Sequence, residues 1–236
     1  MDSLRSVEKI QGGGRRDRQH GLKRHRPVMV REVVGLLVSG PDDVIVDATV
    51  GSGGHAAAIL EALGPQGRLI GLDRDVRALT RTRMNLSGQG ERRVLSVSDF
   101  RDLAAAVRHS APQGVDGVLM DLGVSSEQLD DPGAGFSYLS AGPLSMTMEP
   151  GRHPDARDLL NTSTEEDLAH LLRDNADVRT ARRVARAVVA ARPLLTTADL
   201  AAAARKGGAG RPDDLARVFQ AVRIAVNDEL GALSRA

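Results

Sequence analysis

The chain has 236 residues, with 32 Lys and Arg against 31 Asp and Glu, 41% hydrophobic residues and no cysteine. This length and composition suit one large or two small globular domains and exclude global disorder. The lack of cysteine excludes a thiol nucleophile and thiolate metal sites, and the scattered histidines favour no other metal site. No apolar run approaches the roughly 20 residues that cross a bilayer, and no signal peptide is recognisable. We therefore expect a cytoplasmic protein without metal or membrane partner.

Positive charge is concentrated at the start of the chain. Residues 1–30 contain eight Lys or Arg, Arg24 and Arg26 among them, and only three acidic residues. Such clustering predicts that residues 1–27 form a basic arm that contacts nucleic-acid phosphates. A solvated tail interrupted by glycine is the alternative.

Short apolar runs alternate with helical stretches between residues 44 and 121. Strands are predicted at 44–48, 68–73, 93–97 and 115–121, and helices at 55–63, 75–86 and 100–109. This alternation is typical of an α/β fold with a parallel, doubly wound sheet. The pattern offers four strands and no fifth, so we expect an incomplete parallel sheet.

The chain beyond residue 150 is predicted to be all helical. Helices are expected at 165–174 behind a capping box of Ser163 and Glu166, at 178–192, at 198–206 between Thr197 and Gly207, and as one helix over 213–233. The stretch 123–150 has neither a helical nor a strand period and is predicted to be a loop.

A glycine-rich turn, "DATVGSGGHA", joins the first strand to the next helix. Gly51, Gly53 and Gly54 allow a ligand to approach the N–H groups at the helix start, although a tight turn without a ligand is the alternative. Asp73 ends the next strand, where dinucleotide folds place the acid that binds a ribose hydroxyl. Asp47 before the turn and the absence of G-x-x-x-x-G-K-[ST] favour a cationic ligand without phosphates, a description that S-adenosylmethionine meets.

Nine segments between His25 and Leu233 resemble, in the same order, the 16S ribosomal RNA cytosine-N4 methyltransferases (methyltransferase H, MraW type). They are "HRPVM", "VDATVGSGGHA", "GLDRD", "DGVLMDLGVSSEQLDDP", "GFSY", "GPLSM", "LLNTSTEEDLAHLL", "ARRVARAVV" and "FQAVRIAVNDEL". The resemblance implies a Rossmann-like class I S-adenosylmethionine methyltransferase domain at 28–135, an all-helical inserted domain at 136–212 and a helix at 213–236 that returns to the first domain. It also implies S-adenosylmethionine as cofactor and 16S rRNA of the small ribosomal subunit as partner.

The resemblance further implies a set of cofactor contacts. These are Gly53, Gly54, His55, Asp73, Phe100, Asp121 and Gln128. The residues themselves independently favour only the glycines and Asp73. Without the family, Phe100 is equally well interpreted as a core ring, His55 is better interpreted as a local helix cap than as a ligand, and Gln128 has no signal of its own.

The implied reaction needs an oriented cytosine amine and an acceptor for its proton. Asp121, at the tip of the fourth strand, is the candidate acceptor, with a purely cofactor-binding or loop-capping role as the alternative. Methylation at ring carbon C5 is disfavoured, because that reaction normally uses a thiol adduct. An unpaired or flipped base also needs a stacking partner. We therefore predict RNA contacts at Phe136 and Tyr138, with packing between domains as the alternative, and at Arg24 and Arg26.

The chain departs from the family pattern in two places. Ala134, Ala141, Ser145 and Thr147 stand where the family has charged residues, and the family continues beyond the equivalent of Ala236 into the last strands of the sheet. An unpaired edge is therefore expected at the fourth strand. Because such an edge favours association, a homodimer is an alternative to a monomer. The predicted function is N4 methylation of a cytosine in 16S rRNA. The alternative is a catalytically impaired or truncated paralogue that acts as a cofactor- and RNA-binding module.

Overall fold

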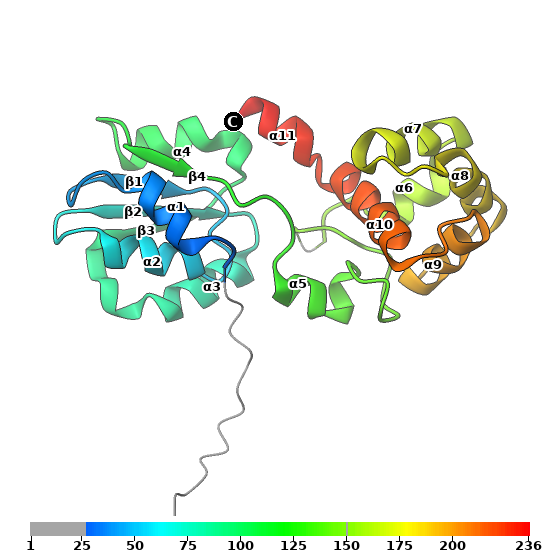
Figure 1. The fold of residues 1–236 in the computed structure, drawn as a ribbon, viewed down its shortest axis with the longest axis horizontal. Helices are drawn as coiled ribbons and strands as arrows, with labels where there is room; N and C mark the ends of the chain where they lie inside the picture. The colour runs from blue at the N-terminus through cyan, green and yellow to red at the C-terminus, as the bar shows by residue number, and fades with distance from the viewer. Residues whose placement is uncertain (1–26, 150) are drawn as a thin grey trace, which may run out of the picture.

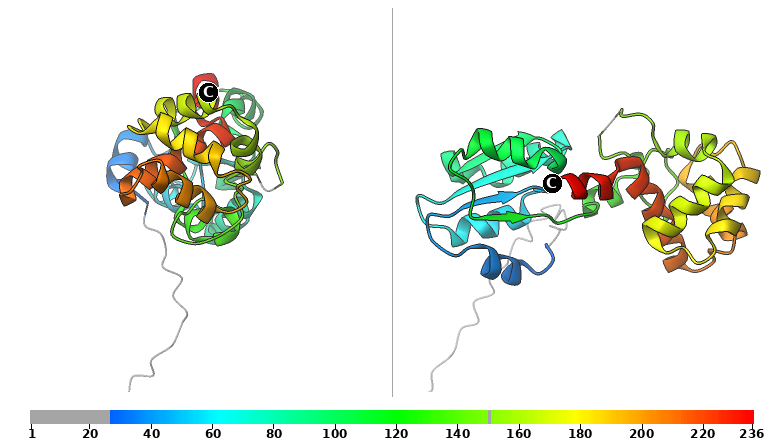
Figure 2. Two further views of the ribbon diagram at one scale, coloured as in Figure 1. Left: turned by 90° about the vertical axis from the view of Figure 1, so that its right-hand side faces the viewer. Right: turned by 90° about the horizontal axis from the view of Figure 1, so that it is seen from above.

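The computed structural model describes residues 27–149 and 151–236, which form two packed units side by side (Figure 1). We call the strands with α1–α4 and α11 the sheet unit, and helices α6–α10 the helical unit. The right-hand view in Figure 2 shows the two units at opposite ends of the molecule. The basic arm predicted at 1–27, with Arg24 and Arg26, lies outside the described residues except for Pro27.

Four parallel strands form the sheet. They are β1 (Val44–Asp47), β2 (Arg68–Asp73), β3 (Arg93–Val97) and β4 (Gly117–Leu119), in the order β3-β2-β1-β4. The register places Ile45 between Leu69 and Gly117. The apolar runs of β1 and β2 are continuous because both faces of a parallel sheet are covered, and Ile45 and Val46 are fully buried. The predicted α/β fold with a four-stranded parallel sheet is confirmed.

Helices cover both faces of the sheet. They are α1 (Val30–Leu37), α2 (Gly54–Ala62), α3 (Val76–Asn85), η1 (Ser87–Arg92), η2 (Phe100–Asp102), α4 (Leu103–Ser110) and α11 (Glu229–Arg235). Ile45 and Leu69 pack against α1, α2 and α3, whereas Val46 and Ile70 pack against η2, α4 and α11. Neighbouring strand residues therefore point to opposite layers, as the period of two requires. Helix α1 was not anticipated from the sequence.

The helical unit has its own apolar core. It contains α6 (Ala156–Thr162), α7 (Glu165–Ala176), α8 (Ala181–Ala190), α9 (Thr197–Lys206) and α10 (Pro212–Asn227). Helix α10 contributes Leu215, Val218, Phe219 and Val222 to this core, at the spacing of one helix face. No helix within 27–149 or 151–236 combines the length and apolar character that a membrane span requires.

Two predicted helix caps are wrong by one residue. Thr164 caps α7, while the predicted cap Ser163 follows the last turn of α6. Thr196 caps α9, because the predicted cap Thr197 is buried and its hydroxyl bonds to the loop at 140–142. Neighbouring hydroxyl residues have the same local capping ability, so the more distant contacts decide which one is used.

The helix predicted at 213–233 is interrupted. Asp228 adopts the left-handed conformation, with φ of 50°, and separates α10 from α11. Helix α10 packs in the helical core, and only α11 returns to the sheet unit, where Ala232 is fully buried. Within the segment predicted to return, 213–236, the part that packs on the sheet core thus follows Asp228. The domain limits predicted at 28–135, 136–212 and 213–236 stay predictions.

The stretch predicted as a loop contains two short helices. They are α5 (Ser126–Asp130) and η3 (Pro132–Ala134). Ser125 caps α5 by accepting a hydrogen bond from the Gln128 N–H, and the Gln128 side chain accepts one from the Ser125 N–H. This reciprocal capping stabilises a helix too short to show a hydrophobic period.

A polar contact joins the two units. The Arg74 guanidinium, at the end of β2, donates to the Asn227 carbonyl at 3.2 Å and to the Met148 sulfur at 2.6 Å. The fully buried Asn227 side chain donates to the carbonyls of Met146 and Arg223 and accepts from the Met148 N–H at 2.9 Å. Asn227 thus fixes the outgoing and returning segments of the chain to each other.

We expect Asn227→Ala to lower the free energy of unfolding by about 1–3 kcal/mol. The substitution leaves the buried N–H of Met148 and the Met146 carbonyl without their partners. Chemical denaturation measures the change, and Gln220→Ala, at an exposed position of the same helix, is the control. Equal stability of the two variants would contradict the assigned role of Asn227.

Candidate functional site

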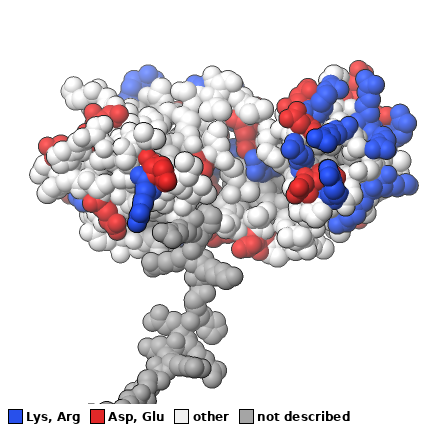
Figure 3. All heavy atoms as spheres, viewed as in Figure 1, with Lys and Arg blue, Asp and Glu red and all other residues white. Residues whose placement is uncertain are grey.

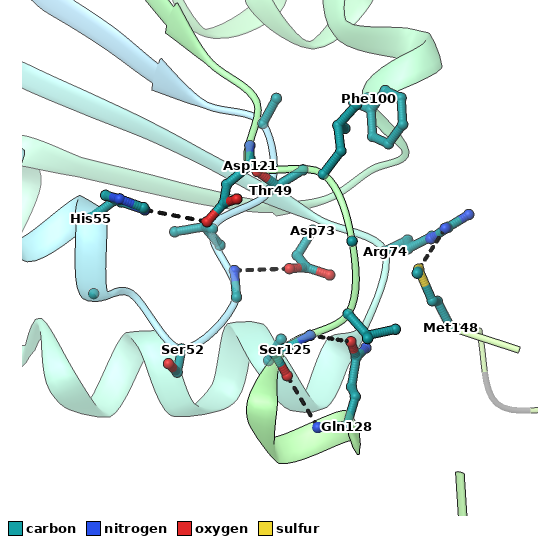
Figure 4. Close-up of a pocket in the computed structure, with 18 of the residues that line it drawn as sticks. Thr49, Ser52, His55, Asp73, Arg74, Phe100, Asp121, Ser125, Gln128 and Met148 are labelled. Atoms are coloured by element: carbon teal, nitrogen blue, oxygen red, sulfur yellow. Dashed lines mark hydrogen bonds and ion pairs between the residues drawn. The ribbon is translucent and has the colours of Figure 1, made fainter. Parts of the chain in front are cut away.

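An open cavity of about 1050 Å³, including its mouth, lies at the carboxyl edge of the sheet (Figure 4). Its wall combines the glycine turn after β1, the ends of β2 and β4, and the start of α5. Met148 and Glu229, from the connections to the helical unit, complete the wall. Open α/β sheets bind their ligands at this edge, so the cavity is the candidate site.

The glycine turn has the backbone geometry expected from the sequence. Gly51 and Gly53 have φ of 54° and 87°, in the left-handed region where glycine is favoured. Gly54 opens α2, and a Cβ at this position would overlap the ring of Pro27. The first two glycines therefore set the turn, and the third allows close packing of the segment before α1.

Asp73 holds the glycine turn in place. Its Oδ2 accepts a hydrogen bond from the Gly51 N–H at 2.9 Å, and its Oδ1 accepts one from the Asp75 N–H at 2.8 Å (Figure 4). Burial raises the pKa of Asp73 above its ordinary value, although these two N–H groups oppose the shift. A carboxylate has about four acceptor positions, so Asp73 retains capacity for a ligand hydroxyl.

Asp47 lies beneath the cavity wall, with only 1% of its surface exposed. Burial raises the pKa of Asp47 to about 7; the Thr49 N–H lowers it, and the negative charges of Asp73 and Asp121 raise it further. The sequence singled out Asp47 as a negative charge that favours a cationic ligand. The structure weakens that argument, because a carboxyl group with this pKa is only partly ionised near neutral pH.

Asp121 and His55 face each other across the cavity mouth. The Asp121 carboxylate is 56% exposed and lies 3.7 Å from Nδ1 of His55, and the Asp121 N–H donates to the Thr49 hydroxyl at 2.7 Å. Nε2 of His55 lies 2.9 Å from the Val28 carbonyl, which can only accept, so Nε2 carries the hydrogen and Nδ1 faces Asp121. His55 therefore does not cap α2, the alternative left open by the sequence.

Phe100 and Gln128 also line the cavity. Phe100 is 7% exposed and packs with Val46 and Leu72 in the sheet core, so its ring belongs both to the core and to the wall. Gln128 lies on α5 and points toward the strand ends in Figure 4. Six of the seven residues predicted to contact the cofactor therefore line the cavity. The seventh, Gly53, lies in the glycine turn but does not line the cavity.

The two predicted stacking rings lie elsewhere. Phe136 is 6% exposed within the helical core, and the Tyr138 ring meets the Phe219 ring edge-on with centroids 5.7 Å apart. Neither ring lines the cavity, and both pack in the core of the helical unit rather than between the two units. Their proposed contact with RNA stays a prediction. The predicted RNA contacts Arg24 and Arg26 are outside the described residues.

Several residues of the wall were missed by sequence reasoning. Two of them follow strands, a position that could have identified them: Thr49 lies two residues after β1, and Arg74 directly follows β2. Met148 and Glu229 carry no local signal, because their place in the wall depends on the contact between the two units.

The chain matches the MraW methylase family over residues 22–236. The ribosomal RNA small subunit methyltransferase H of Rubrobacter xylanophilus is 48% identical over 217 residues, which cover 90% of this chain and 69% of that protein. The protein of the same name from Heliobacterium modesticaldum is 44% identical over 224 residues, or 90% and 71% of the two chains. A solved rRNA methylase structure from Streptococcus thermophilus is 20% identical and covers 48% of this chain and 66% of that one, with a TM-score of 0.33, which is too low for a structural argument.

We expect Asp47→Asn to remove a pH dependence of stability. Because the folded-state pKa is about 7 and the ordinary value 3.8, the folded chain holds this proton more tightly, and the free energy of unfolding falls as pH rises through that window. The variant cannot ionise, so its stability should gain on the unmodified chain by up to about 1.4 kcal/mol per pH unit. Chemical denaturation across the window measures this gain. Asp42→Asn, at an exposed position, should not gain stability in this way. If Asp47→Asn showed no gain either, the raised pKa of Asp47 would be contradicted.

Proposed function

The chain belongs to the MraW methylase family, and on this premise we propose that it is an S-adenosylmethionine-dependent methyltransferase acting on ribosomal RNA of the small subunit. One observation carries the proposal. In a chain of this family, the cavity at the carboxyl edge of the sheet combines a glycine turn, a strand-end acid at Asp73 and a second acid, Asp121, at its mouth. The first two features suit a nucleoside cofactor, and the third suits a reacting group that enters from solvent.

The residues present fit S-adenosylmethionine. Asp73 has acceptor capacity for ribose hydroxyls, and Phe100 offers an apolar ring for adenine. Gly53, Gly54 and His55 form the turn and helix start beside which the rest of the cofactor would lie. When bound, the cofactor supplies an activated methyl group on a positively charged sulfur.

The chain must then orient an amine and accept its proton. We propose the exocyclic N4 amine of a cytosine in 16S rRNA, whose lone pair is delocalised into the ring until the nitrogen is held in place. The exposed Asp121 carboxylate can accept the proton, and Thr49 fixes the backbone from which it projects. His55 stands beside it with Nδ1 available for the same proton.

The target base must reach this mouth. A cytosine inside a duplex cannot, so the substrate base is unpaired or flipped out of its stack. The chain has no cysteine anywhere in its sequence, so it lacks the thiol that methylation at ring carbon C5 normally uses. The lack of a thiol favours the amine over C5 as the acceptor of the methyl group.

Transfer of labelled methyl groups from S-adenosylmethionine to small ribosomal subunits tests the proposed activity. We expect Asp121→Asn to reduce kcat by about 10²–10⁴-fold, the usual contribution of a positioned proton acceptor. Asp130→Asn, an exposed acid on α5, should leave kcat unchanged. A folded, cofactor-binding chain that transfers no methyl group would instead be a non-catalytic binding module. Normal kcat in Asp121→Asn would assign the proton to another group.

We expect Asp73→Asn to weaken cofactor binding by about 10–100-fold, which corresponds to the loss of one charge-assisted hydrogen bond. Isothermal titration calorimetry with S-adenosylmethionine measures the change. Because Asp73 also holds the turn, thermal unfolding must show that the variant is folded. Asp42→Asn should bind normally, and unchanged affinity in a folded Asp73→Asn would exclude the ribose contact.

A further inference from the structure

Basic side chains gather at the outer end of the helical unit. Figure 3 shows Lys and Arg crowding this end of the molecule, whereas the face of the sheet unit in the same view carries few charged groups. Figures 1 and 2 place α8 and α9 at this outer end, opposite the sheet and its cavity.

Helix α8 supplies the first part of this surface. Arg182, Arg183 and Arg186 all lie on its exposed side, and Arg186 is four residues from Arg182 and three from Arg183. The exposed Arg179 precedes the helix. Side chains at this spacing are neighbours along one helix face. The opposite side of α8, with Val184 and other apolar residues, is buried in the helical core.

The end of α9 supplies the second part. Arg205 and Lys206 are exposed in its last turn. The two glycines that follow press against α8: a Cβ on Gly207 would lie 2.5 Å from Cα of Val184, and one on Gly208 would lie 2.8 Å from Nη2 of Arg183. This close approach places the end of α9 beside the start of α8. We call Arg179, Arg182, Arg183, Arg205 and Lys206 the basic cluster.

The charges of the basic cluster are largely uncompensated; the Asp214 carboxyl, whose pKa is lowered chiefly by its hydrogen bond with Arg211, also interacts with Arg179. Among the residues that the structure describes, none of its five members forms an ion pair, whereas the nearby Arg186 pairs with Glu165 and Arg211 with Asp214. Five unpaired cations produce a local positive potential that attracts anions. Such a surface suits a partner that carries closely spaced negative charges.

The cluster fits a phosphate backbone better than a protein surface. Four of its members are arginine, whose planar guanidinium binds phosphate through paired hydrogen bonds. A protein partner usually buries an apolar centre. Yet none of the large exposed hydrophobic side chains in the described part of the chain belongs to α8 or α9.

We propose that the basic cluster is a second RNA-binding surface, remote from the cavity, which holds the phosphate backbone of the substrate. The inference rests on the proposed function, since an RNA substrate is assumed. An RNA that reaches both the cavity and the cluster must extend across the two units. The protein therefore selects a large folded RNA over a short oligonucleotide that carries the same target cytosine.

The test compares two triple variants of the full chain. Arg182→Gln, Arg205→Gln and Lys206→Gln together remove cluster charge, and Arg68→Gln, Arg83→Gln and Arg108→Gln remove the same charge from exposed sites of the sheet unit. We expect the cluster variant to raise KM for the small subunit by about tenfold or more. Because each lost phosphate contact lowers the dependence of binding on salt by about 0.7–0.9 units, the loss of three contacts should lower the slope by about two to three units.

The other readouts separate the proposal from its alternatives. The cluster variant should retain its kcat, its affinity for S-adenosylmethionine and its activity on a short oligonucleotide. Unchanged KM and salt slope in an active cluster variant would overturn the remote surface and leave the proposed function intact. If the unmodified chain transferred no methyl group, the proposed function would be wrong. The affinities of the unmodified chain and the cluster variant for small subunits, measured without turnover, would then test whether the basic cluster binds RNA. Weaker binding to intact subunits but not to their deproteinised RNA would assign the surface to a protein partner and refute the proposal.

Discussion

The contact between Arg74 and Asn227 determines how the sheet unit and the helical unit are arranged. Arg74 projects from the end of β2, and Asn227 closes the last turn of α10 while its side chain binds the Met146 carbonyl and the Met148 N–H. Arg223 and Glu229 add an ion pair that is mostly shielded from water, with a distance of 2.8 Å. Because Met148 and Glu229 line the cavity, the site is complete only when the units are in contact. The site therefore depends on the same contacts that hold the two units together.

Within the site, single acidic residues have structural as well as chemical roles. Asp73 fixes the glycine turn through the Gly51 N–H and still has acceptor capacity directed at the cavity. The Thr49 hydroxyl fixes the backbone of Asp121, and the exposed carboxylate of Asp121 lies at the mouth beside His55. The acid that positions the ligand is thus rigid, and the acid proposed to take the proton is accessible. Such a division suits a reaction in which the cofactor must be held still while a large substrate arrives.

The sheet could be predicted from sequence because its determinants are local. The apolar runs at 68–73 and 93–97 are bounded by charged or turn residues, and both strands form with the predicted limits. The interruption at Asp228 could not be predicted, since the apolar period continues through it and its cause, the contacts of Asn227, lies some 80 residues away at 146–148. The same distance hides Met148 and Glu229, the wall residues of the cavity that come from the connections to the helical unit.

The chain leaves the sheet unit, forms the helical unit and then returns to the sheet unit, and this path has a consequence for its biosynthesis. Ala232 of α11 is fully buried beside η2, in a core that otherwise consists of residues from the first half of the chain. A chain made from its N-terminus produces the entire helical unit before it produces Ala232. The last layer over this face of the sheet must therefore wait for the helices to emerge from the ribosome. Closing so long a loop is entropically slow, so we expect α11 to dock after the helical unit has formed.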